Sequence, residues 1–145
     1  MPIETQTPLT LFGTIAPTIV IDHDQPPTTI IKETDHFHVV VNWNVQGSAL
    51  PMLGGQFEVR ACFESIGPGS EKVFGPVVVQ VSAGVGSLTD RNYTADIFVP
   101  DHGLTEGAYD LVAVLTYKNN GVPGNIAGYS DEKIIQVYKP SPAFP

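Results

Sequence analysis

Residues 36–45 read HFHVVVNWNV, and every odd position in this stretch holds an apolar side chain. The even positions include two histidines and two asparagines. Because successive side chains of a strand point to opposite faces, this alternation predicts a strand with one buried face. Residues 56–64, QFEVRACFE, repeat the pattern and place Cys62 on the wetter face.

Working outward from these two segments, the same signals recur along most of the chain. Glycine and proline turn signals separate the segments, and no stretch shows a helical period. We therefore predict an all-β chain, a single antiparallel Greek-key β-sandwich of about seven to eight strands. An extended Thr/Pro-rich arm would occupy residues 1–17, the sandwich residues 18–139 and a Pro-rich tail residues 140–145. The further predicted strands are residues 19–21, 28–32, 77–81, 93–99, 109–117 and 133–138.

Composition limits the classes of partner. The chain has 145 residues, 15% of them charged, and a formal net charge of -8. An acidic surface is a poor match for phosphates, so we expect neither nucleic acid nor an anionic membrane as a partner. The lone cysteine cannot form an intramolecular disulfide, and the N-terminus lacks a basic region followed by an apolar run. We expect a cytoplasmic protein, or one that becomes part of a virion or released particle.

Residues 104–113, LTEGAYDLVA, resemble the corner that leads into strand F of the immunoglobulin-like superfamily. Within that superfamily the chain is most similar to fibronectin type III and bacterial Ig-like repeats, because Trp43 matches the tryptophan in their strand B. The resemblance spans about residues 18–139. It implies that Tyr109 returns its hydroxyl to the backbone upstream, with Gly107 permitting the corner. It implies the fold alone, since such folds host unrelated functions.

In a sandwich of this topology three loops gather at one end, and they contain almost no charge. Loops normally run over the surface, so their apolar side chains would form an exposed patch. We hypothesise a protein-binding surface there. In the alternative, these loops fold back and plug the open end of the sandwich. The predicted contact residues are Leu50, Met52, Leu53, Val122, Ile126 and Tyr129.

The N-terminal arm is a second candidate contact, through Leu9 and Leu11. It alternates threonine and leucine and has too little apolar mass to fold alone. Such a segment can add as a strand to an exposed sheet edge, on its own chain or on a neighbouring copy.

The opposite end of the sandwich collects acidic residues and histidines. His36 and His38 point to the same side of a strand, and Asp101 and His102 are predicted at the same end. These four residues are the candidate metal ligands. No third ligand stands at a recognisable spacing, so we expect no metal site and no cofactor.

No nucleophile, phosphate-binding loop or paired-carboxylate motif emerges, so we expect no enzyme. The leading hypothesis is a non-catalytic structural or interaction module. It would assemble with protein, its own copies or others, into a particle, filament or phage-type decoration, and we expect a homo-oligomer. The alternative is an accessory domain that binds carbohydrate or a small ligand, with Phe98, Tyr129 and Tyr138 as exposed aromatic platforms.

Overall fold

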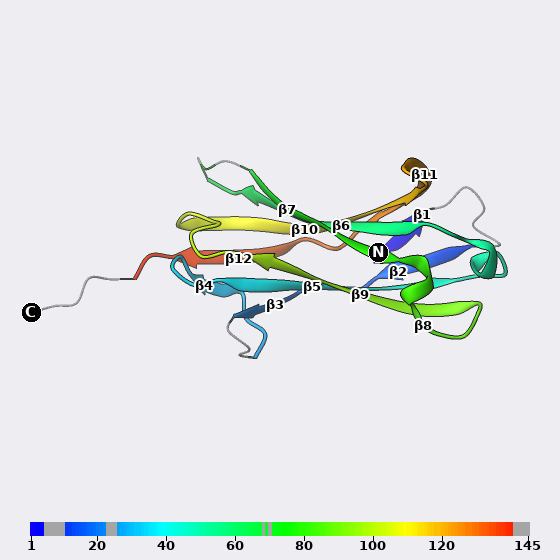
Figure 1. Ribbon diagram of the computed structural model, residues 1–145. Coiled ribbons are helices and arrows are strands. Elements are labelled where there is room, and N and C mark those ends of the chain that lie inside the picture. Colours follow the sequence, from blue (N-terminus) through cyan, green and yellow to red (C-terminus); the bar gives the residue numbers. More distant parts are fainter. Residues whose placement is uncertain (5–10, 23–25, 68, 70, 141–145) are drawn as a thin grey trace, which may run out of the picture.

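A computed structural model describes residues 1–4, 11–22, 26–67, 69 and 71–140 of the chain. Its regular structure consists of strands and two short 3-10 turns (Figure 1), so the prediction of an all-β chain is confirmed. No helix in this part of the chain is long and apolar enough to cross a membrane.

The strands follow one another with short connections. In chain order they are β1 (Pro2–Glu4), β2 (Phe12–Ile15), β3 (Ile19–Asp22), β4 (Ile30–Lys32), β5 (Phe37–Gln46), β6 (Gln56–Ser65), β7 (Lys72–Gln80), β8 (Val85–Gly86), β9 (Asp90–Val99), β10 (Gly107–Asn119), β11 (Val122–Tyr129) and β12 (Lys133–Tyr138). The 3-10 turns are η1 (Leu50–Met52) and η2 (Val81–Ala83).

Two long pairings form the two layers that Figure 1 shows one above the other. In one layer β5 pairs with β9 along its whole length, and β2 and β3 share its other edge. In the other layer β10 pairs with β6, which in turn pairs with β7. The second edge of β10 is shared by β12 along its first half and β11 along its second half.

The sheet is mixed, so the prediction of a purely antiparallel sheet is wrong. β4 runs parallel to β12, with Ile30 opposite Gln136 and Ile31 opposite Val137. The reason is the path of the chain, which leaves β3 on β5 in one layer and enters β4 on β12 in the other. Alternation within a strand carries no information on the direction of its partner.

Residues 1–17 contribute two strands to this sheet. β1 pairs with β11 and with β2, and β2 pairs with β5, so the N-terminal segment links the two layers within its own chain. The α-amino group of Met1 donates to the Ile15 carbonyl (3.1 Å), and Ile15 N donates back to the Met1 carbonyl (2.8 Å). Ile3 and Leu11 are buried. Leu9 lies outside the described residues.

The core between the layers is lined by the inward side chains of the alternating strands, including Phe37, Trp43 and Phe57, as the period of two predicts. The Trp43 ring stacks on Tyr93 at 5.5 Å and meets Phe57 edge-on at 5.7 Å. Burying each such side chain stabilises the fold by roughly 1.5 to 3 kcal/mol.

Candidate interaction surfaces

Three loops meet at one end of the two-layered structure. Val81 N donates to the Gly55 carbonyl (3.1 Å), and Gly47 N donates to the Thr89 carbonyl (2.9 Å). The hydroxyl of Tyr117, near the end of β10, donates to the Gly54 carbonyl. We call residues 47–55, 81–89 and 119–125 the loop end.

The predicted patch is only partly at the surface. Leu50 is 0% exposed and Ile126 is buried, so their assignment to an exposed surface is wrong. Leu53 is half-buried and packs against the core. In η1, Leu53 N donates to the Leu50 carbonyl (3.1 Å), and this tight turn directs Leu50 inward and Met52 outward. Leu50 therefore closes this end of the core, as the alternative interpretation predicts.

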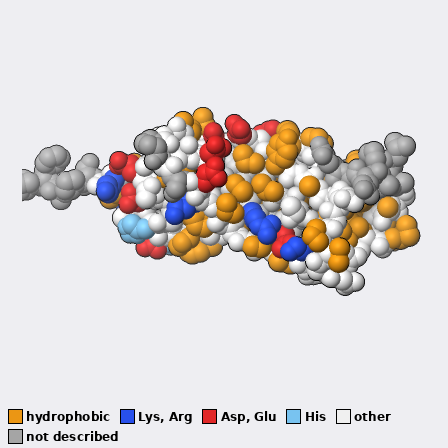
Figure 2. Space-filling view, turned by 90° about the horizontal axis from the view of Figure 1, so that it is seen from above, with side chains coloured by type: hydrophobic (Ala, Val, Ile, Leu, Met, Phe, Trp, Pro, Cys, Tyr) orange, Lys and Arg blue, Asp and Glu red, His pale blue; other side chains and the backbone are white. Residues whose placement is uncertain are grey.

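The exposed apolar side chains of the loop end form a different set from the one predicted. Met52 (83% exposed), Val85 (74%), Leu88 (67%) and Val122 (65%) are the four most exposed large apolar side chains of the described residues. No charged residue occurs in the three loops. Figure 2 shows the right end of the molecule in orange and white, apart from grey atoms, with red and blue side chains confined to the rest of the view.

Sequence reasoning missed Val85 and Leu88 because they lie in a glycine-rich turn without strand alternation. The sequence signal that could have found Val85 and Leu88 is that each is an apolar residue in a loop without charged residues. Tyr129 is exposed, but it lies on β11 opposite Val114 of β10, outside the loop end.

The loop end is held in place by two buried tyrosines. The Tyr93 hydroxyl donates to the Val81 carbonyl (2.7 Å), and burial raises the pKa of Tyr93 and of Tyr117. The loops cross these rings so closely that a Cβ on Gly84 would lie 2.5 Å from Tyr93 Cζ, and one on Gly124 2.5 Å from Tyr117 Cδ2. The backbone at Gly84 and Gly124 therefore runs directly against the two rings, where a side chain would collide with them.

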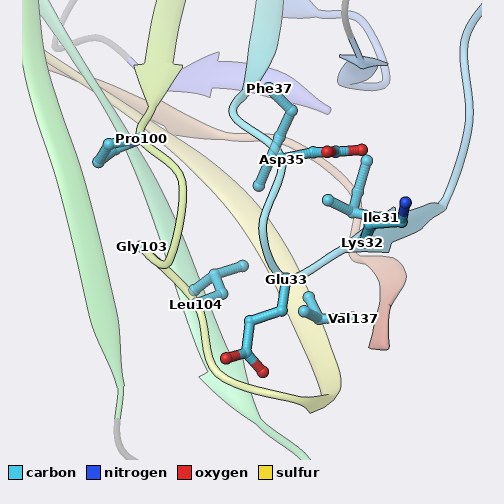
Figure 3. A pocket seen from close by; sticks show the side chains of 9 residues that line it. All are labelled: Ile31, Lys32, Glu33, Asp35, Phe37, Pro100, Gly103, Leu104 and Val137. Carbon is cyan, nitrogen blue, oxygen red and sulfur yellow. The ribbon is translucent and has the colours of Figure 1, made fainter. Parts of the chain in front are cut away.

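We call residues 33–36 and 100–106 the acidic end. There the polar groups bond to one another. The Glu33 carboxylate accepts from Glu106 N (3.1 Å), and the Glu106 carboxylate accepts from Lys139 N (3.1 Å). His102 N donates to the Glu33 carbonyl (3.0 Å). Figure 3 shows residues 31–37 beside the loop 100–104, with Leu104 next to Glu33; the side chains leave no room for a ligand between them.

The candidate metal ligands form two separate contacts with nearby carboxylates. His38 Nδ1 lies 2.6 Å from Asp96 Oδ1, and His102 Nδ1 lies 3.5 Å from Asp101 Oδ2. The His36 and His38 rings flank Phe98, with centroids 5.7 and 5.3 Å from it. Within the ranges that the structure describes, no three His, Cys, Asp or Glu side chains gather as metal ligands.

The outer face of β6 and β10 carries a compact charged group. Glu58 is buried, with its Oε2 3.2 Å from Lys118 Nζ and its Oε1 3.8 Å from Arg60 Nη2. Cys62 is half-buried on the same face; burial raises the pKa of its thiol, and Arg60 partly opposes this.

The three aromatic residues proposed as a ligand platform are all exposed but do not share a surface. Phe98 lies on β9, whereas Tyr129 and Tyr138 lie on β11 and β12 in the other layer. The comparisons with known proteins found no matching family model and no matching curated protein.

Proposed function

We propose that this protein is a non-catalytic assembly module that associates with further copies of itself through the loop end. One observation carries the proposal. The four most exposed large apolar side chains, Met52, Val85, Leu88 and Val122, all lie in three loops without charge. Apolar side chains at one site, rather than scattered singly, are typical of a protein-binding surface.

Charge supports a second copy as the partner. Each chain carries a formal net charge of -8, so two copies repel one another over most of their surfaces. Repulsion is smallest where the loops hold no charge. Burying the exposed apolar area there stabilises a contact by about 25 cal/mol per Å². Because Tyr93 and Tyr117 already hold the loops, little conformational entropy is lost on association.

We also propose that the module is an immunoglobulin-like sandwich. The Tyr109 hydroxyl donates to the Thr105 carbonyl (2.8 Å), and this contact supports the proposal because the resemblance implies a tyrosine bonded to the backbone upstream. Trp43 is buried between the layers, the position that the resemblance gives it. Such a module suits a component of a particle, a filament or a phage-type decoration, assembled in the cytoplasm or carried in a virion.

Sedimentation equilibrium of matched variants tests the assembly function. We expect the wild-type chain to form concentration-dependent oligomers, and the variant Met52→Ser/Leu88→Ser to sediment as the 15.6 kDa monomer. The control, Ile66→Ser/Ile134→Ser, removes two exposed apolar side chains outside the loop end and should leave the oligomer intact. A loop-end variant with the same mass distribution as the wild type contradicts the proposal.

A further inference from the structure

The outer face of β5 and β9 contains two adjoining hollows. One, of about 360 Å³, is lined by Thr14, Asn42, Asn44 and Asn92 among others. The other, of about 440 Å³, includes Thr94 of β9 and extends past the edge of β9 to Val79, Ala83 and Val85. The two share Asn42, Asn92 and Tyr93, so together they form one continuous depression in the size range of small-molecule sites.

Part of the lining is fixed by a network of amides. Asn44 Nδ2 donates to Asp90 Oδ1 (2.7 Å) and to Asn92 Oδ1 (3.0 Å). Gln46 Nε2 donates to Asn44 Oδ1 (2.9 Å). Asn44 and the carbonyl side of Asn92 are therefore held in defined orientations beside the hollows, which reduces the entropic cost of binding a ligand there.

The remaining polar groups are available. Among the described residues, the side chains of Thr14, Asn42 and Thr94 and the amide nitrogen of Asn92 make no hydrogen bond. Each amide can donate and accept, and each hydroxyl can do both. No lysine or arginine lines either hollow.

The same face continues to an exposed aromatic ring. Thr94, Asp96 and Phe98 point outward in succession along β9, and Phe98 is 53% exposed between the His36 and His38 rings. A flat apolar ring beside a row of donors and acceptors matches a molecule with polar edges and an apolar face. Asp90 and Asp96 stand near the two ends of the row and would repel an anion.

We propose that this face binds a neutral oligosaccharide. Vicinal hydroxyls of one sugar unit would pair with Asn42, Asn92 and Thr94 in the depression, and the C–H face of a further unit would lie on Phe98. The site goes beyond self-association at the loop end. It adjoins the loop end, because Ala83 and Val85 line one side of the second hollow. The side chains proposed to bond the sugar, Asn42, Asn92 and Thr94, lie outside the loop end.

Titration followed by NMR tests the site. The probes are maltotetraose, cellotetraose, mannotetraose and β-1,4-galactotetraose, with tetragalacturonic acid as the acidic counterpart. We expect one of the neutral probes to shift the amide signals of residues 42 and 92–98 saturably, with a dissociation constant of roughly 1 mM. The acidic probe should bind more weakly.

Asn42→Ala and Thr94→Val should each weaken that binding about tenfold, the effect of losing about 1.4 kcal/mol of hydrogen bonding. Neither side chain makes a hydrogen bond within the described residues, and thermal unfolding of both variants verifies the fold. Gln136→Ala removes an exposed amide on β12, outside both proposed surfaces. It is the matched control and should leave the affinity unchanged.

Three outcomes overturn the proposal: no saturable shift with any neutral probe up to about 20 mM, unchanged affinity in both Asn42→Ala and Thr94→Val, or preference for the acidic probe. The loop-end variant Met52→Ser/Leu88→Ser separates the two proposals, because it should bind the oligosaccharide like the wild type while losing self-association.

Discussion

The loop end and the acidic end are both closed by loops over a buried leucine, but they expose different side chains. Loops close each end, and a buried leucine lies under them: Leu50 at the loop end and Leu104 at the acidic end. At the acidic end the outer groups are carboxylates that accept hydrogen bonds from the backbone. At the loop end they are the side chains of Met52 and Leu88, which point into solvent.

The comparison shows that the groups that close an end of the core differ from the groups that the loop end exposes to solvent. One buried leucine and a few hydrogen bonds close either end. The exposed apolar side chains of the loop end add nothing to that closure, since most of their area remains in water. This difference is the basis of our proposal that a second copy contacts the loop end rather than the acidic end.

The largest expected effect is on the free energy of unfolding, and it distinguishes the buried Leu50 from the exposed Met52 in η1. Leu50→Ala should lower the free energy of unfolding by about 2 to 5 kcal/mol, because it leaves a cavity under the loops. Met52→Ala should change it by less than about 0.5 kcal/mol. Urea denaturation of the monomer measures both, and equal effects would show that η1 does not orient the two side chains oppositely.

A smaller effect compares the tyrosines that anchor the two ends. Tyr117→Phe removes a hydrogen bond to Gly54, and Tyr109→Phe removes one to Thr105. Each substitution removes the hydrogen bond of a buried tyrosine hydroxyl, so each should cost about 1 kcal/mol in urea denaturation. Of these two variants, only Tyr117→Phe should also weaken self-association, because Tyr117 contacts the loop end and Tyr109 does not. Weaker association in Tyr109→Phe would remove the distinction between the two ends.

The hydrogen bonds of the Glu33 and Glu106 carboxylates at the acidic end should contribute less to stability than the tyrosine hydrogen bonds do. Glu33→Ala removes the acceptor of Glu106 N, a bond exposed to solvent, and should cost about 0.5 kcal/mol of stability. The amide proton of Glu106 should exchange faster in this variant, while the amides of the loop end stay unchanged. A loss comparable to that of Leu50→Ala would mean that the acidic end is held by its carboxylates rather than by Leu104.

The smallest expected effect is on the alkylation rate of Cys62, which depends on the charges of Arg60 and Glu71. Burial raises the pKa of the thiol, Arg60 lowers it and Glu71 raises it, so alkylation at pH 8 should be slower than for an unstructured cysteine and should accelerate at higher pH. Arg60→Gln should raise the pKa further and slow the reaction, whereas Glu71→Gln should lower the pKa and speed it. Iodoacetamide labelling followed by mass spectrometry measures the rates, and effects of the same sign in both variants would contradict this account.

The sequence predicted the elements that depend on local alternation. β5, β6 and β9, the hydroxyl contact of Tyr109 and the gathering of the three loops were all accessible from it. Period-two patterns and turn residues encode the strands directly. The Tyr109 contact was implied by the immunoglobulin-like resemblance, and the gathering of the loops by the expected topology.

The features that were missed depend on contacts between distant residues. The parallel pairing of β4 with β12 and the insertion of β1 beside β11 involve segments more than 100 residues apart. The inward direction of Leu50 depends on packing under η1, and the composition of its loop does not determine it. The depression at Asn42 likewise arises from the register of β5 against β9 and β2, which alternation leaves open.

Hydrogen–deuterium exchange at low and high protein concentration tests the central claim most directly. Self-association through the loop end predicts that exchange in residues 47–55 and 81–89 slows as concentration rises, while exchange in residues 100–106 stays constant. Exchange independent of concentration in all three segments, or protection confined to the acidic end, would contradict the claim.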